Sequence, residues 1–171
     1  MSSSSLFLSI AQQAQCVAER LLSRHLTVTT AESCTGGGVA YALTGVAGSS
    51  RWFERSFVTY SNTAKQEMLL VPETVLAEHG AVSEAVVRAM AEGALRAARA
   101  HVAVALSGIA GPDGGTADKP VGLVWIAWSR QLPGEETPVT IARSCQFAGD
   151  RILVREQAIL TALQGICDFI Q

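Results

Sequence analysis

The chain has 171 residues, and this length predicts one domain spanning residues 1–171. Its 13 Lys and Arg residues and 15 Asp and Glu residues give a formal net charge of −2. No basic excess is available to bind a phosphate backbone, so we expect no nucleic-acid partner. Apolar residues make up 49% and charged residues 16%, which excludes a disordered chain. No apolar run approaches the roughly 20 residues of a membrane-spanning helix, so we expect a cytoplasmic protein without membrane contact.

The N-terminal third predicts two strands, a helix before them and a helix between them over residues 39–43. The serine run at residues 2–5 is interpreted as a frayed lead-in with a helix N-cap, followed by an amphipathic helix to about Ser23. This segment lacks the basic start of a signal peptide. The β-branched segment 26–30 and the aromatic-rich segment 52–60 each predict a strand.

The middle of the chain predicts helices. Asn62 is a candidate cap for a helix over residues 63–70, which places Lys65 in its first turn. Residues 72–80 are expected to form a short helix or a loop. Ser83 is the expected cap of a long helix that reaches Ala100.

The last third predicts three strands and a closing helix. The nearly continuous apolar run 101–106 is typical of a central strand that is buried on both faces. Further strands are expected over 121–128 and 139–147, and an amphipathic helix over 152–170. Together these elements predict an α/β fold, a single three-layer domain in which a mixed β-sheet is packed between α-helices.

The cysteines and histidines do not predict a metal site. The four cysteines form no CxxC pair, and we expect them to be reduced. The three histidines lie far from one another and from the cysteines along the sequence, so we expect surface or helix-end positions rather than metal ligands.

Two glycine-rich loops follow predicted strands, at residues 31–38 and 107–115. In open α/β sheets ligands bind at the carboxyl ends of strands, so together these loops predict a ligand site. Neither loop matches the P-loop or the dinucleotide fingerprint, and we expect no bound cofactor. We expect the helix after the first loop to present free backbone N–H groups at its start.

Ser33 is the candidate nucleophile in the first loop, because a serine at a helix start has backbone donors beside it for an oxyanion. Taken alone, this feature favours a simple helix cap over a nucleophile. Cys34 is a rival nucleophile, since a helix N-terminus lowers the pKa of a thiol. Lys65 is a candidate base if it is desolvated, and Tyr60 precedes it at a strand-to-helix corner.

Six motifs occur in one order along the chain: TTAESCTGG at 29–37, GSS at 48–50, FVTYSN at 57–62, GAVSE at 80–84, SGIAGPDGG at 107–115 and PVG at 120–122. In this combination the chain resembles the nicotinamide-nucleotide amidase family, also called the CinA C-terminal domain. The resemblance covers about residues 12–164, and the length corresponds to the stand-alone form of the family.

This resemblance implies an amidohydrolase that converts nicotinamide mononucleotide (NMN) and water to nicotinate mononucleotide and ammonia, without a metal, in pyridine nucleotide salvage. It implies Ser33 as nucleophile, with Lys65 and Tyr60 as its activating partners. Backbone N–H groups around Cys34, Thr35 and Gly36 are the expected oxyanion donors. It also suggests a homodimer.

The substrate phosphate requires further donors. The candidates are the second loop, which begins with Ser107 and Gly108, and Arg151 at the start of the last helix. Arg151 is equally compatible with a surface position, and Asp113 with either a ribose contact or a turn cap. Two alternative functions remain at this point: a catalytically silent nucleotide-binding module, and an amidase for another carboxamide.

Overall fold

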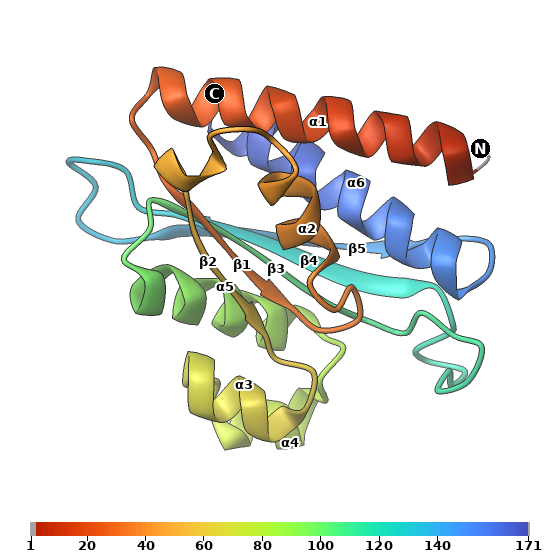
Figure 1. Cartoon of the computed structure of the whole chain (residues 1–171). Coiled ribbons are helices and arrows are strands. Elements are labelled where there is room, and N and C mark those ends of the chain that lie inside the picture. Colours follow the sequence, from red (N-terminus) through yellow and green to blue (C-terminus); the bar gives the residue numbers. More distant parts are fainter. Residues whose placement is uncertain (1–2, 171) are drawn as a thin grey trace.

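The structure is a computed structural model that describes residues 3–170. Its centre is a five-stranded sheet with the strand order β2-β1-β3-β4-β5 (Figure 1). The neighbouring strands β2, β1 and β3 are parallel, whereas β4 and β5 are antiparallel to their neighbours. The strands are β1 (Val28–Glu32), β2 (Phe53–Val58), β3 (Val102–Gly108), β4 (Leu123–Arg130) and β5 (Val139–Gln146).

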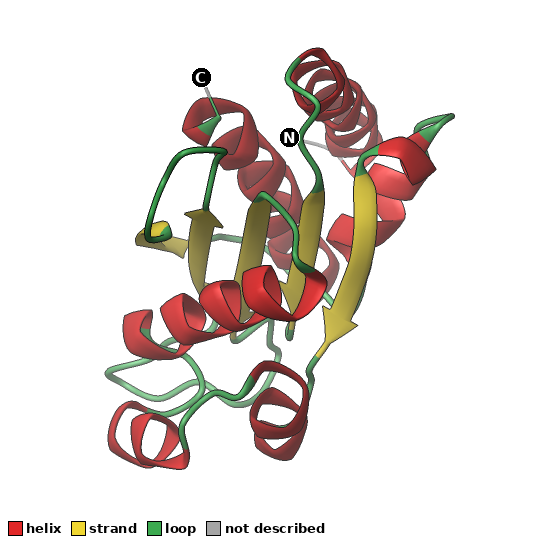
Figure 2. Cartoon of the chain, turned by 90° about the vertical axis from the view of Figure 1, so that its left-hand side faces the viewer, coloured by secondary structure: helices red, strands yellow, loops and turns green. Residues whose placement is uncertain are grey.

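Helices cover both faces of this sheet (Figure 2). One layer contains α1 (Ser3–Ser23), α2 (Gly38–Thr44) and α6 (Arg151–Phe169), and a short 3-10 turn, η1 (Ser49–Arg51), leads into β2. The other layer contains α3 (Asn62–Leu69), α4 (Glu73–His79) and α5 (Glu84–Ala98). The mixed three-layer α/β fold expected from the sequence is therefore confirmed.

β3 is the buried centre of the sheet. Five consecutive residues, Val102 to Leu106, have no exposed surface, because β1 and β4 flank the strand and a helical layer covers each face. The continuous apolar run in the sequence reflects this burial on both faces.

The carboxyl ends of several strands meet at one edge of the sheet. β1, β2 and β3 are parallel and end there at Glu32, Val58 and Gly108. β5 ends at the same edge, since it is antiparallel to β4, which is antiparallel to β3. The segments that follow these four strands include both glycine-rich loops, the start of α3 and the start of α6.

The structure corrects several local expectations. α1 begins at Ser3, so a frayed lead-in is wrong for residues 3–5, and Ser2 lies outside the described residues. Ser61, not Asn62, caps α3: its backbone is extended and its hydroxyl accepts the Ala64 N–H, whereas Asn62 is already helical. β1 runs two residues further than expected, to a polar residue whose partners are described below.

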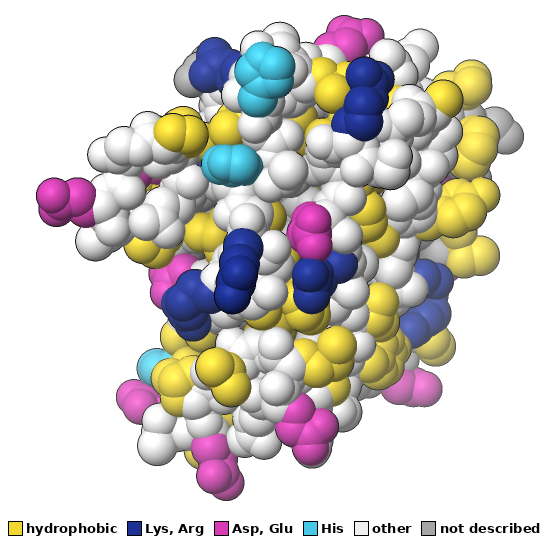
Figure 3. Space-filling model, turned by 60° about the vertical axis from the view of Figure 1, so that its left-hand side comes forward, with side chains coloured by type: hydrophobic (Ala, Val, Ile, Leu, Met, Phe, Trp, Pro, Cys, Tyr) yellow, Lys and Arg dark blue, Asp and Glu magenta, His cyan; other side chains and the backbone are white. Residues whose placement is uncertain are grey.

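The face of the molecule in Figure 3 carries charged side chains of both signs. On this face, basic and acidic side chains are interspersed among apolar and neutral atoms.

All four cysteines are free, and the sulfur atoms of Cys16 and Cys167 lie 3.3 Å apart between α1 and α6. Within residues 3–170, no three His, Cys, Asp or Glu side chains form a group that could hold a metal ion. Within the same range, no helix combines the length and apolarity that crossing a bilayer requires.

Candidate active site

The first glycine-rich loop is organised by Glu32, the last residue of β1. Its side chain is fully buried, and its two carboxylate oxygens accept hydrogen bonds from the N–H groups of Gly37, Val39 and Ala40 at 2.9–3.1 Å. The Thr35 hydroxyl donates to the same carboxylate at 2.7 Å. The start of α2 is therefore occupied by a protein carboxylate, and the expectation that it presents free N–H groups is wrong for these three donors.

The turn between Glu32 and α2 needs glycine at Gly37. This residue has φ +92°, a left-handed conformation that residues with a Cβ adopt with strain. The turn carries Ser33, whose N–H donates to the carbonyl of Leu106 on β3 at 3.0 Å. Ser33 is thus fixed at the end of β1, beside the end of β3.

Ser33 and Lys65 are in direct contact. Lys65 Nζ lies 3.2 Å from Ser33 Oγ and donates a second hydrogen bond to the Thr59 carbonyl at 2.8 Å. The two residues come from adjacent parallel strands, because Ser33 follows β1 and Lys65 lies in α3 after β2. The distance between the amine and the hydroxyl lies within the range that proton transfer from a nucleophile to a base requires.

The environment of Lys65 favours a neutral amine. The side chain is only 1% exposed, and its two partners, a hydroxyl and a carbonyl, carry no charge. Burial lowers the pKa of Lys65 from its ordinary value of 10.5, and the Cys34 side chain opposes this with a smaller effect. The loss of a proton near neutral pH is therefore easier than for a solvent-exposed lysine.

The rival nucleophile, Cys34, is buried and protonated. Burial, with a smaller contribution from the Glu32 carboxylate, raises the pKa of this thiol to about 11. A hydrogen bond from the Cys34 backbone N–H lowers this pKa by less than burial raises it, and Arg155 and Lys65 lower it further by smaller amounts. Since the thiolate is the reactive form of cysteine, this environment favours Ser33 as the nucleophile.

The turn carries the three N–H groups that the sequence predicts as oxyanion donors. The Gly36 N–H donates to the Ser33 carbonyl at 3.0 Å, so this expected donor is already engaged. The Cys34 N–H interacts with the thiol of its own residue, and none of the hydrogen bonds found among residues 3–170 uses the Thr35 N–H. The N–H groups of Cys34 and Thr35 remain candidate donors.

Tyr60 and Arg151 form a second pair at the same edge. Arg151 Nη2 donates to the Tyr60 hydroxyl at 3.1 Å, and Nη1 donates to the Gly111 carbonyl at 2.8 Å. Tyr60 is 61% exposed, and no hydrogen bond in the described part of the chain joins it to Ser33 or Lys65. The guanidinium of Arg151 thus connects the end of β2 with the second glycine-rich loop.

The other predicted residues of the second loop have mixed surroundings. Ser107 is buried, and its hydroxyl donates to the Ala81 carbonyl at 2.7 Å. Gly108 pairs with Val124 in the sheet, and a Cβ at this glycine would lie 2.7 Å from the Leu123 carbonyl oxygen. Asp113 is exposed, and none of the hydrogen bonds found among residues 3–170 involves its side chain.

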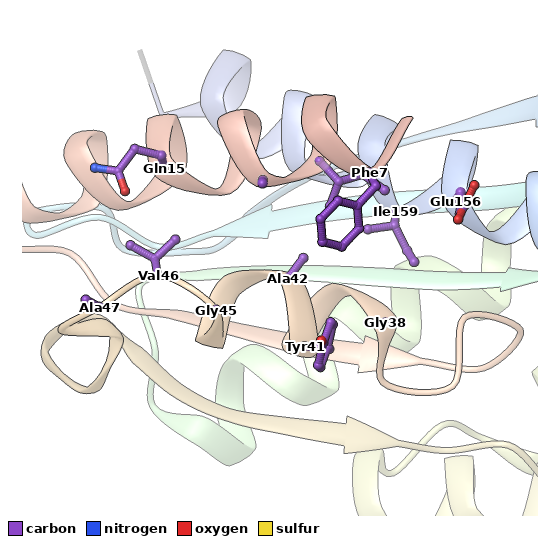
Figure 4. Close-up of a pocket in the computed structure, with 12 residues that line it drawn as sticks. Phe7, Gln15, Gly38, Tyr41, Ala42, Gly45, Val46, Ala47, Glu156 and Ile159 are labelled. Carbon is purple, nitrogen blue, oxygen red and sulfur yellow. The ribbon is translucent and has the colours of Figure 1, made fainter. Parts of the chain in front are cut away.

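A cavity of about 500 Å³ lies elsewhere, between α1, α2 and α6. Figure 4 shows Phe7 from α1, Tyr41 and Ala42 from α2, and Glu156 and Ile159 from α6 among its lining residues. Ser33, Tyr60 and Lys65 do not line it. The reactive side chains therefore lie outside this apolar cavity.

Sequence reasoning did not single out Glu32 or Arg155. Arg155 Nη2 donates to the Thr35 carbonyl at 2.8 Å across 120 positions of the chain. For Glu32, the available signal was a carboxylate at the end of a β-branched strand, directly before a glycine-rich turn. Arg155 gave no comparable signal, since a charged residue one helical turn after Arg151 is typical of an exposed helix face.

Comparisons with known proteins agree with this fold. Residues 10–170 match the family described as the CinA C-terminal domain. The chain is 57% identical over 155 residues to the Escherichia coli (strain K12) protein named nicotinamide-nucleotide amidohydrolase PncC, covering 91% of each chain. The Pseudomonas putida protein of the same name is 53% identical over 148 residues, covering 86% of this chain and 89% of that protein.

A solved structure is also similar. The competence/damage inducible protein CihA from Agrobacterium tumefaciens superposes with a TM-score of 0.90 at 41% sequence identity, covering 95% of this chain and 96% of that chain. The resemblance drawn from the six sequence motifs is confirmed: this chain belongs to the CinA C-terminal domain family.

Proposed function

We propose that this chain is an amidohydrolase that converts NMN and water to nicotinate mononucleotide and ammonia. The observation that carries the proposal is the 3.2 Å contact between Ser33 Oγ and the buried Lys65 Nζ at the carboxyl edge of the sheet. The names of the E. coli and P. putida relatives support the choice of substrate.

In the proposed reaction, Lys65 acts as general base. Its neutral amine takes the Ser33 proton while Oγ attacks the carboxamide carbon. The C–N bond then breaks, and the amide nitrogen leaves as ammonia with the proton that Lys65 returns. Lys65 next takes a proton from water as the water oxygen attacks the acyl-serine ester, and it returns that proton to Ser33 Oγ. The acid is released as the carboxylate, and ammonia takes up its proton. The Thr59 carbonyl holds Nζ beside Oγ through both steps.

The oxyanion is assigned to the N–H groups of Cys34 and Thr35. Both belong to the turn that carries Ser33; the Thr35 N–H is unengaged among the hydrogen bonds of the described residues, and the Cys34 N–H interacts only with the thiol of its own residue there. Donors that are fixed before the substrate arrives stabilise developing charge without reorganisation, and removing one costs about 10²–10³-fold in rate.

Tyr60, Arg151 and the second loop complete the proposal. The Tyr60 hydroxyl is assigned to the proton relay, and Arg151, Ser107, Gly108 and Asp113 to contacts with the ribose and phosphate. Support comes from their shared edge of the sheet and from the Arg151 hydrogen bonds to both Tyr60 and the Gly111 carbonyl. A cytoplasmic location, a homodimer and the lack of nucleic-acid binding remain predictions.

The test is ammonia release from NMN, nicotinamide riboside and free nicotinamide. We expect the wild type to prefer NMN, and Ser33→Ala to lose about 10⁴-fold or more in kcat. Ser144→Ala, on the exposed face of β5, is the matched serine control and should retain activity. Activity of Ser33→Ala together with inactivity of Cys34→Ala would transfer the nucleophile role to the thiol. Activity on free nicotinamide alone would exclude recognition of the phosphate.

A further inference from the structure

Arg155 lies against the turn that carries Ser33. It is in the second turn of α6, four residues after Arg151, so both guanidinium groups come from the same helix face. Nη2 of Arg155 donates to the Thr35 carbonyl at 2.8 Å, and a Cβ placed on Gly36 would lie 3.6 Å from the same nitrogen. α6 thus extends one arginine to each glycine-rich loop.

The contact fixes a turn that Glu32 holds from the other side. The Thr35 hydroxyl donates to the Glu32 carboxylate, and the Thr35 carbonyl accepts from both Gly38 N–H and Arg155. Thr35 is fully buried. Its side chain and its carbonyl are therefore anchored, which limits the movement of the backbone that carries its N–H, one of the two candidate oxyanion donors.

The charge of Arg155 is not neutralised locally. No salt bridge within the described residues reaches it, and its Nε is buried without a hydrogen-bond partner among them. Its positive charge reaches the turn, as its effect on Cys34 indicates: Arg155 lowers the pKa of this thiol, whereas burial raises it by more. An unpaired cation of this kind also favours negative charge that develops beside Ser33.

We propose that Arg155 is a positioning residue of the amidase: it holds the Ser33–Gly36 turn so that the Cys34 and Thr35 N–H groups face the oxyanion. This inference rests on the proposed function. Arg155 acts through the turn rather than on the substrate, so its loss lowers kcat more than it changes KM.

The experiment compares Arg155→Ala with Arg20→Ala, using NMN as substrate. Arg20 is a matched control, because its Nη1 also donates to a backbone carbonyl at 2.8 Å, that of Cys167 in the α1–α6 contact. We expect Arg155→Ala to lower kcat about 10²-fold with a KM change below about threefold. Arg20→Ala should leave kcat within about twofold of the wild type, since its contact joins α1 to α6 and does not involve the turn that carries Ser33.

Guanidinium ion provides a readout that a merely structural role would not move. At millimolar guanidinium, well below denaturing concentrations, we expect partial recovery of kcat in Arg155→Ala and none in Arg20→Ala. Arg155→Lys covers the case in which the alanine variant does not fold. Lysine keeps the positive charge but lacks the planar guanidinium group with its several N–H donors, so we expect at least about a tenfold loss in kcat at unchanged KM.

Three results would overturn the inference. The first is a higher KM at unchanged kcat in Arg155→Ala or Arg155→Lys, which indicates a direct substrate contact. The second is an equal loss of kcat in the Arg155 and Arg20 variants. The third is a wild-type kcat in an Arg155 variant. A wild-type protein that releases no ammonia from NMN would instead refute the proposed function.

Discussion

Glu32 should be the largest single contributor to the stability of the first glycine-rich loop. Substitution to alanine leaves three backbone donors at the start of α2 without their carboxylate, those of Gly37, Val39 and Ala40. A buried donor without a partner costs about 1–3 kcal/mol; this applies in full to the Val39 N–H, whereas the Gly37 and Ala40 bonds are only partly buried, so about 9 kcal/mol is an upper bound for the three. Domains of this size have a free energy of unfolding of about 5–15 kcal/mol, and we therefore expect Glu32→Ala to be unfolded or close to it.

Glu32→Gln is the measurable variant. It keeps one acceptor oxygen but places an NH₂ group against backbone donors, and it replaces charged hydrogen bonds by neutral ones, each weaker by about 1 kcal/mol. We expect a loss of about 2–4 kcal/mol in the free energy of unfolding. With a urea m-value of about 2 kcal/mol/M, the unfolding midpoint should fall by about 1–2 M.

The assay is urea unfolding followed by circular dichroism, with Glu84→Gln as control. Glu84 lies in the first turn of α5 but is exposed and paired only with Arg88, an i,i+4 contact worth about 0.3–0.5 kcal/mol. If Glu32→Gln costs no more than Glu84→Gln, the reasoning that the carboxylate holds the start of α2 is wrong.

Three further predictions test the site and its support. Lys65→Met should lower kcat by about 10²–10⁴-fold yet raise the free energy of unfolding. Because burial lowers the pKa of Lys65, the unfolded chain binds a proton more readily than the native protein does. The gain in the free energy of unfolding of Lys65→Met over the wild type should therefore be largest at low pH and shrink as the pH rises toward 10.5. A pH-independent difference in urea unfolding would contradict this. In native protein at pH 8, iodoacetamide should leave Cys34 unmodified and activity intact, because the thiol is 6% exposed with a pKa of about 11; rapid Cys34 alkylation in peptide mass spectra would contradict it. Gly93→Ala should destabilise by about 1–3 kcal/mol despite the better helix propensity of alanine, because its Cβ would lie 2.1 Å from the Leu69 carbonyl oxygen at the end of α3; an unchanged or higher melting temperature would count against this packing.

Local patterns predicted most of the elements but not all of their ends. The apolar run of β3 and the Ser83 cap of α5 are legible because burial and capping follow from neighbouring residues. The strand predicted over 26–30 lies two residues later, at Val28–Glu32, since Glu32 is an unfavourable strand residue until α2 supplies its hydrogen bonds. The cap of α3 was placed one residue late for a simpler reason: Ser61 and Asn62 are both good caps, and only backbone conformation distinguishes them.

The candidate site was predicted in its residue types but not in its connections. Ser33, Lys65 and Tyr60 were identified before the structure, and the contact between Ser33 and Lys65 agrees with the pairing expected. The hydroxyl of Tyr60 is engaged by Arg151 instead, and the start of α2 by Glu32. In both cases two possible partners exist for one polar group, and a sequence motif does not show which of the two forms the hydrogen bond.

The sequence by itself determined the three-layer class, the absence of a basic excess and, through six ordered motifs, the family. The tertiary structure decided which side chains meet, because β1 lies between β2 and β3 in the sheet. That order brings Lys65 to Ser33 across 32 positions, and α6 brings Arg155 to Thr35 across 120. Such contacts depend on strand order and helix packing, which are properties of the whole chain rather than of any local segment. The low charge content is consistent with this arrangement: one buried carboxylate, Glu32, and one guanidinium from α6, Arg155, hold the turn that carries Ser33.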